Sequence, residues 1–241
     1  MTNLNGNNLL SALQSSDRDL IDASLRELRL SAGAALYEPG DFVESVYFPC
    51  DSAMAGFFVA LPDGKGVETA LIGREGAIGG IVSQGRLPAY ARCTVQYAGT
   101  FLVMSSLELE DLKDQSLTIR HLFARYADCL MAQIFQTTAC NAGHTINQRA
   151  AKWMLSTIER SGTQTIEMTQ DQLAEMLGIG RSYISRVIAS MKVEGLISVS
   201  RRKMEITDID RIRAIACDCN DHVKRHFDTV LEGVYPEEAN A

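Results

Sequence analysis

Basic and hydroxyl side chains gather in one short stretch of the chain. Arg181, Ser182, Ser185 and Arg186 lie within six residues, on the side of an expected helix that its apolar residues leave free. An arginine can donate two hydrogen bonds to the O6 and N7 atoms of guanine, and a serine hydroxyl can bind a base edge or a phosphate. We therefore predict that these four side chains contact DNA, with Arg186 as the principal base-reading residue.

Two helical patterns separated by a tight break would position these side chains. Thr169 and Gln172 form a capping-box pattern for a first helix, and Gly178 turns the chain after it. A second helix is expected to start near Arg181 and to end at Gly195. Its inner face is an apolar set spaced i, i+3, i+4 and i+7, namely Ile184, Val187, Ile188 and Met191. This pattern predicts a helix-turn-helix, whose second helix enters the DNA major groove.

A basic β-hairpin is predicted directly after the second helix. The apolar runs that end at Val199 and Ile206 flank the segment Ser200-Arg-Arg-Lys203, so the motif is expected to be a winged helix-turn-helix whose wing lies on phosphates. The full set of predicted DNA-binding residues is Thr169, Gln170, Arg181, Ser182, Tyr183, Ser185, Arg186, Arg201, Arg202 and Lys203.

The distribution of charge favours a nucleic-acid partner, although the chain carries a net charge of −7. Between Arg181 and Lys203 six basic residues stand against Glu194 alone, a local net charge of +5 on an acidic body. No charged leader precedes Arg18 and no apolar run has membrane-spanning length, so we expect a cytoplasmic protein with no membrane partner. The six scattered cysteines suit a reducing compartment, and we expect no disulfide.

The first hundred residues have the pattern of a small β-sheet domain. A short N-terminal helix is expected to open at Ser16, with an apolar face formed by Leu20, Ile21, Leu25 and Leu28. From residue 33 to residue 107, short apolar runs alternate with turn signals rich in Gly, Pro and Asp. Many short strands with frequent turns predict an α+β chain that begins with a β-barrel or jelly roll.

One long helix is predicted from residue 107 to residue 142, where neither Gly nor Pro interrupts the pattern before Gly143. Its apolar stripe consists of Ile119, Leu122, Phe123, Tyr126, Leu130 and Ile134. The stripe can pack against the chain's own sheet domain or against the same helix of a second copy, and its spacing favours a homodimer interface. We predict domains at 1–106 and 143–241, joined by this dimerisation helix.

Several segments resemble the cyclic AMP receptor protein and fumarate-nitrate-reduction regulator (Crp/Fnr) family. They are Leu173-Ala-Glu-Met-Leu-Gly178, Ser185-Arg186, Glu194-Gly-Leu-Ile197, Tyr37-Glu-Pro-Gly-Asp41 and Val46-Tyr-Phe48. The resemblance covers nearly the whole chain. It implies a cyclic-nucleotide-binding-like barrel, a long dimer helix and a winged helix-turn-helix domain that regulates transcription at promoters, with RNA polymerase as a further partner.

The sequence departs from this family at two places. Ser182 replaces a glutamate that is frequent in the recognition helix, which puts the usual half-site sequence in doubt. In the nucleotide cassette, Gly80 stands where the family has a glutamate for the ribose, and no Arg-Ser pair follows for the cyclic phosphate. We therefore expect that cyclic AMP is not the effector. The barrel either binds nothing or binds another, acidic ligand through the candidate pocket residues Gly79, Gly80, Arg86, Tyr90 and Arg92.

Other classes of function find less support. All four histidines lie outside the expected barrel strands, which argues against a cupin-type metalloenzyme, and no nucleophile elbow or phosphate loop is present, so no enzyme is predicted. Cys217, Cys219, His222 and His226 could hold a metal, but we expect them to be packing and surface residues, with no metal or other cofactor. The alternative to a DNA-binding regulator is a sensory or scaffold protein whose helix-turn-helix contacts protein.

Overall fold

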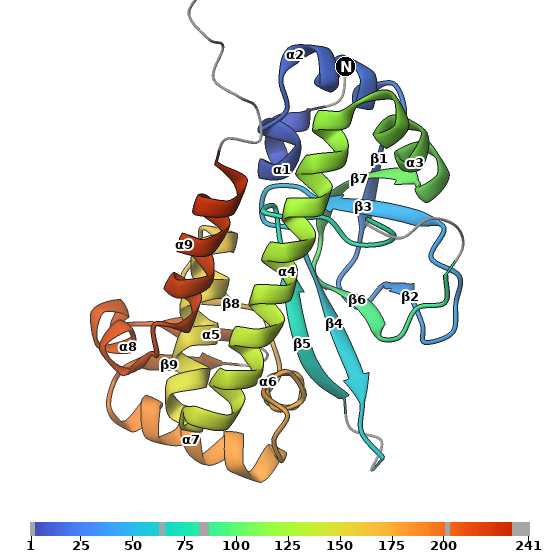
Figure 1. Cartoon of the computed structure of the whole chain (residues 1–241). Coiled ribbons are helices and arrows are strands. Elements are labelled where there is room, and N and C mark those ends of the chain that lie inside the picture. Colours follow the sequence, from blue (N-terminus) through green and yellow to red (C-terminus); the bar gives the residue numbers. More distant parts are fainter. Residues whose placement is uncertain (1–2, 63–65, 82–86, 201–202, 233–241) are drawn as a thin grey trace, which may run out of the picture. The chain divides into compact units, whose positions relative to one another are not determined.

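The computed structural model describes residues 3–62, 66–81, 87–200 and 203–232 (Figure 1). The chain divides into two compact units. The sheet unit comprises Met1–Phe57, Ala70–Gln133 and Val223–Ala241, and the helix-turn-helix unit comprises Phe58–Thr69 and Ile134–His222. Among the described residues, no helix is both long and apolar enough to cross a membrane.

The sheet unit begins with short helical turns and continues with seven strands. The turns are η1 (Leu4–Gly6), α1 (Asn8–Ser11) and α2 (Ser15–Asp22). The strands are β1 (Arg26–Leu30), β2 (Ala35–Tyr37), β3 (Ser45–Pro49), β4 (Met54–Ala60), β5 (Gly66–Ile72), β6 (Arg92–Tyr97) and β7 (Gly99–Ser105). The end of β4 and the start of β5 fall within Phe58–Thr69 and so belong to the helix-turn-helix unit. They form two sheets, β1-β7-β3 and β2-β6-β4-β5, and the described pairs β1–β7, β3–β7 and β2–β6 are antiparallel. This arrangement confirms the predicted fold class. The N-terminal helix is shorter than expected, because Leu28 lies in β1 and is exposed.

Two helices replace the single long helix that the sequence predicts. Helix α3 spans Ser106–Gln115 and α4 spans Leu117–Gly143. Ser116 separates them in an extended conformation, and its hydroxyl oxygen accepts a hydrogen bond from the backbone of Ile119 while the hydroxyl donates to Asp17. A serine that offers the backbone this alternative ends a helix without Gly or Pro.

Helix α4 presents its apolar stripe to the interior of the sheet unit. Ile119, Leu122, Phe123 and Tyr126 are fully buried within one chain. The Tyr126 hydroxyl donates to the backbone oxygen of Ala77 at 3.0 Å, and a side chain on Gly76 would overlap the tyrosine ring. The assignment of these four α4 residues to a dimer interface is therefore wrong, because they form the core of their own chain.

Among the described residues, the helix-turn-helix unit has its own core under four helices and a small sheet. These elements are α5 (Ile146–Ser161), β8 (Thr165–Ile166), α6 (Gln170–Leu177), α7 (Arg181–Val193), β9 (Ile197–Ser200), β10 (Lys203–Ile206) and α8 (Ile209–Ile215). Helix α9 (Cys219–Leu231) begins in this unit, and its residues from Val223 onward belong to the sheet unit. The sheet has the order β8-β10-β9, with antiparallel pairing. Trp153, the only tryptophan of the chain, is buried in this core.

Gly79 and its neighbour Gly80 provide a test of the packing around β3. Gly79 has a φ of +120°, and a side chain there would overlap the backbone oxygen of Ser45, whereas a methyl group on Gly80 would only contact Ser106 at 3.6 Å. We predict that Gly79→Ala lowers the free energy of unfolding by about 1–3 kcal/mol, since strain and overlap coincide. The matched Gly80→Ala variant should stay within about 0.5 kcal/mol of the parent in urea unfolding. Equal stability of the two variants would contradict this.

Candidate nucleic-acid interface

Helix α7 separates an apolar inner face from a basic outer face. Ile184, Val187, Ile188 and Met191 are buried in the core of the helix-turn-helix unit, as their spacing predicts. Arg181, Ser182, Tyr183 and Arg186 are exposed in the first two turns, and Ser185 is half-buried. The first turns of a recognition helix are the part that reaches base edges, so the outer face has the required residues in the required place.

The turn between α6 and α7 is fixed from both sides. Thr169 and Gln172 form the expected capping box at the start of α6, and Gly178 ends the helix in the left-handed conformation with a φ of +66°. On the other side, the buried Arg149 of α5 donates from Nη2 to the backbone oxygen of Leu177 at 2.6 Å. Burial lowers the pKa of Arg149, and the nearby Cys140 and Cys217 oppose that shift.

Polar contacts hold the side chains of the outer face in place. The Arg181 guanidinium lies 3.2 Å from an Asp171 carboxylate oxygen, the Ser185 hydroxyl donates to Gln170 at 2.8 Å, and the Arg186 guanidinium stacks on the Tyr183 ring. Exposed ion pairs contribute little to stability, so a phosphate or a base can replace Asp171 as the partner of Arg181 at small cost. The structure thus brings Gln170, Arg181, Tyr183, Ser185 and Arg186 together.

The wing follows α7 as the sequence predicts. Strands β9 and β10 pair in antiparallel register, with Ser200 opposite Lys203. The ammonium group of Lys203 lies 2.9 Å from Glu167, and both side chains are exposed. The other two predicted wing residues, Arg201 and Arg202, lie outside the described residues. The described part of the wing therefore presents one basic side chain next to a carboxylate.

The candidate effector residues do not all have the same environment. Tyr90 is 85% exposed, and Arg92 is half-buried in β6. Gly79 and Gly80 lie in the segment between β5 and β6, where the close approach of β3 accounts for Gly79. Arg86 lies outside the described residues. Packing against β3 is sufficient to explain Gly79, and the effector pocket stays a prediction.

Sequence reasoning missed one group of residues with chemical potential. The side chains of Cys140, His144, Cys217 and Cys219 place their ligand atoms within 4.8 Å of one another. The spacing in the sequence instead suggests a group of Cys217 and Cys219 with His222 and His226. In the structure, Nε2 of His222 lies 3.2 Å from a carboxylate oxygen of Asp218, and His226 is exposed. Burial raises the pKa of the Cys217 thiol to about 12 and also raises that of Cys219. All six cysteines carry free thiols.

Comparison with known proteins agrees with this geometry. Residues 148–215 match the family model of the Crp-like helix-turn-helix domain. This match covers α5 to α8, and therefore both helices of the motif and the wing. The chain matches none of the curated protein sequences.

Solved structures resemble the fold over most of the chain. FixK2 from Bradyrhizobium japonicum superposes with a TM-score of 0.67 at 13% identity, covering 80% of this chain and 98% of its own. A putative transcriptional regulator of the crp/fnr family from Eubacterium rectale gives 0.64 at 18% identity, with coverages of 88% and 98%. The c-di-GMP-responsive global regulator CLP from Xanthomonas campestris gives 0.66 at 13% identity, with coverages of 80% and 99%.

The hydrogen bond from Arg149 provides a test of how the motif is held. We predict that Arg149→Met lowers the free energy of unfolding of the helix-turn-helix unit by about 1.5–3 kcal/mol, because the buried carbonyl of Leu177 loses a charged donor. Denaturant unfolding followed by Trp153 fluorescence reports on this unit. Arg213→Met removes an exposed arginine that pairs only with Asp210 among the described ion pairs, and should change stability by less than about 0.5 kcal/mol. The interpretation fails if the two variants unfold alike.

Proposed function

We infer that this chain, a Crp/Fnr-family transcriptional regulator by its helix-turn-helix domain and its fold, acts as a homodimer that reads a palindromic DNA site in the cytoplasm. The observation that carries the proposal is the outer face of α7. It combines a rigid apolar anchor with two arginines and two serines in the first turns, while Gln170 and Tyr183 support those side chains.

The dimer interface is proposed on a different face of α4 from the one that the sequence favoured. Ile134 is the only exposed residue of the original stripe, and Leu130 is half-buried. The exposed positions Leu117, Ala124, Met131 and Thr138 recur every seven residues. A second exposed series lies four residues after each of them and consists of His121, Asp128, Phe135 and Ala142. Three members of these series, Leu117, Met131 and the 66% exposed Phe135, are large exposed apolar residues, and apolar residues at heptad spacing are typical of a two-helix seam.

The sensor is proposed to respond to something other than cyclic AMP. Gly80 offers no carboxylate for a ribose, and the neighbouring Gly76 and Ala77 are in contact with the buried Tyr126 ring and hydroxyl. The fold does not fix the effector, since one structure of this fold is described as c-di-GMP-responsive. A barrel that has lost its ligand and one that binds another acidic ligand both agree with these residues.

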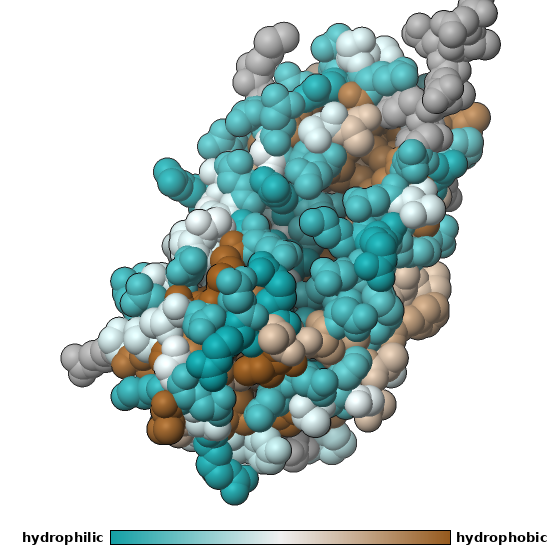
Figure 2. Space-filling model, turned by 90° about the vertical axis from the view of Figure 1, so that its left-hand side faces the viewer, coloured by the Kyte–Doolittle hydropathy of each residue, from teal (hydrophilic) through white to brown (hydrophobic). Residues whose placement is uncertain are grey.

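The competing hypothesis is that the helix-turn-helix contacts a protein instead of DNA. Figure 2 shows one face of the molecule, on which hydrophilic side chains predominate and hydrophobic ones form separate patches. The basic outer face of α7 and Lys203 of the wing favour a polyanion over an apolar protein partner. RNA polymerase would then be a partner at the promoter rather than the target of α7.

The roles of the helix and the wing can be separated by how affinity depends on sequence and salt. We predict that Arg186→Ala weakens binding to a selected site by about 1–3 kcal/mol and leaves binding to random DNA nearly unchanged. Lys203→Ala should weaken both about equally and reduce the slope of log affinity against log salt by roughly one unit per lost contact. Fluorescence anisotropy with both DNAs measures these effects, and added cyclic AMP should alter neither affinity.

Lys192→Ala is the matched control, because Lys192 is exposed on the same helix but in its last turn. Lys192→Ala should weaken binding to the selected site and to random DNA slightly and about equally, as the loss of a weak phosphate contact would. If Arg186→Ala kept full discrimination between the selected site and random DNA, α7 would not be the recognition helix and the protein-contact assignment would take its place.

The proposed seam predicts the oligomeric state. Phe135→Glu should convert a dimer into a monomer at micromolar concentration, because two carboxylates would face each other in an apolar seam. Sedimentation velocity measures the mass. Leu107→Glu is the control, since Leu107 is similarly exposed but lies on α3, and it should leave the dimer intact. A monomeric parent, or a dimer that tolerates Phe135→Glu, would refute this interface.

A further inference from the structure

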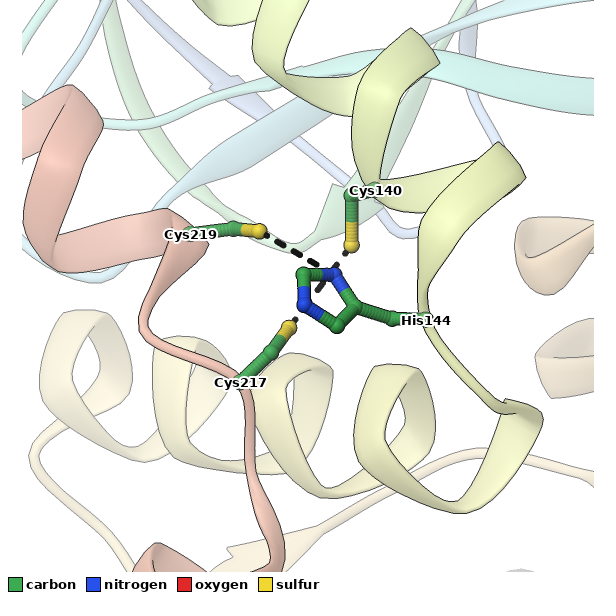
Figure 3. Close-up of side chains that lie close together, drawn as sticks. All are labelled: Cys140, His144, Cys217 and Cys219. Carbon is green, nitrogen blue, oxygen red and sulfur yellow. Dashed lines mark hydrogen bonds between the residues drawn. The ribbon is translucent and has the colours of Figure 1, made fainter.

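Three cysteines and one histidine converge at the end of α4 (Figure 3). Cys140 lies in the last turn of that helix and His144 directly follows Gly143, while Cys217 and Cys219 lie at the connection from α8 to α9. The close-up shows the three sulfur atoms and the imidazole ring pointing toward a common centre. All four residues belong to the helix-turn-helix unit, so their arrangement is fixed within one compact body.

All four ligand atoms lie within 4.8 Å of one another, and two of the distances between them match the edges of a metal-centred tetrahedron. Zinc binds cysteine sulfur at about 2.3 Å and histidine nitrogen at about 2.0–2.1 Å, which separates two sulfurs by about 3.8 Å and a sulfur from a nitrogen by about 3.6 Å. The Cys140 and Cys217 sulfurs lie 3.7 Å apart, and the Cys219 sulfur lies 3.5 Å from Nδ1 of His144. We propose that Cys140, His144, Cys217 and Cys219 form a tetrahedral binding site for a divalent zinc ion.

The type and number of donors favour zinc over other metals. Three thiolates and one imidazole are borderline-soft ligands, and a tetrahedral Cys₃His set is typical of structural zinc. Four protein ligands complete the tetrahedron and leave no position for a substrate, so the ion would have a structural role.

The surroundings supply a second shell suited to a negatively charged metal complex. Three thiolates and one Zn²⁺ carry a net charge of −1. The ammonium group of Lys152 lies 3.4 Å from the Cys140 sulfur, and the guanidinium of Arg149 interacts electrostatically with Cys140 and Cys217. The Gln136 side-chain amide donates to the Cys219 sulfur at 3.2 Å. Donors and cations around the sulfurs stabilise thiolates and orient them toward a metal.

A route for the ion is present in the same unit. A small surface pocket is lined by Lys152, Arg213, Asn220 and the half-buried Cys217. The pocket reaches Cys217, one of the four proposed ligands, while Cys140 and Cys219 are buried. An ion can therefore reach the first ligand from solvent.

The ligands come from two segments that are far apart in the sequence. Residues 140–144 include the junction between α4 and α5, and residues 217–219 lie beyond the helix-turn-helix motif. A zinc ion would crosslink these segments and hold the junction that joins the long helix to the DNA-binding domain. Because an ion that binds only the folded state stabilises it, zinc should raise the melting temperature of this unit.

Metal analysis of the full-length chain tests the proposal. The protein, purified with a reductant and without chelator, should contain one equivalent of zinc per chain. Cys217→Ser and Cys140→Ser should lose it, and so should His144→Ala. Cys129→Ser, a buried cysteine of the same helix, and His222→Ala, an exposed histidine three residues after Cys219, should retain it.

Further measurements keep the test valid if a ligand variant folds poorly. His144→Cys supplies a fourth thiolate and should restore one equivalent of zinc. Cobalt added to the chelator-treated parent should give the intense visible bands of a tetrahedral Co²⁺ ion with thiolate ligands. Lys152→Met, which keeps all four ligands, should weaken zinc binding by about tenfold or more in a competition titration with a chromogenic chelator.

Three outcomes would overturn the proposal. One is a parent chain with six titratable thiols and no metal after incubation with zinc under reducing conditions. Another is an octahedral cobalt spectrum, which would place the ion on other ligands. The third is a Cys140–Cys217 disulfide that forms in air and persists when zinc is present, which would identify the pair as a redox couple. None of these outcomes depends on DNA binding, so they leave the proposed regulatory function untouched.

Discussion

The orientation of the outer face of α7 depends on the hydrogen bond that the buried guanidinium of Arg149 donates. A charge taken out of water must find a partner, and this one binds the backbone oxygen of Leu177, the last residue of α6. The chain turns at the next residue, Gly178, and α7 begins three residues later. The hydrogen bond therefore joins α5 to the turn that sets the direction of α7. The apolar face of α7 then fixes its rotation, and the outer face follows from these two constraints.

Local patterns made the helix-turn-helix predictable. The capping box at Thr169, the left-handed glycine at Gly178 and the i, i+3, i+4, i+7 spacing after Arg181 each act within a few residues. The structure confirms the elements and the inner face that these patterns predicted. Polar partners on the surface, such as Gln170 for Ser185, depend on how two helices pack and could not be read from spacing.

Questions about partners could not be answered from periodicity. The stripe from Ile119 to Tyr126 has a spacing that suits both a dimer seam and an internal core, and the deciding fact is the neighbouring segment at Gly76 and Ala77. Ser116 gave no signal of a helix end, because its role depends on Asp17, 99 residues away. The cysteine–histidine cluster was not predicted either, because it also depends on residues that are far apart in the sequence. Its members lie in segments about 75 residues apart, and the nearer histidines at 222 and 226 suggested a different grouping.

We propose that a pair of α7 helices, one from each protomer, reads an inverted repeat. Selection of fragments from random double-stranded DNA by the purified chain, followed by sequencing of the bound pool, tests it directly. We expect enrichment of one palindromic site whose half-site centres are about 34 Å apart, roughly one helical turn. Enrichment of a single unrepeated motif would contradict the symmetric dimer, and a pool that remains random after several rounds would contradict sequence-specific binding by α7.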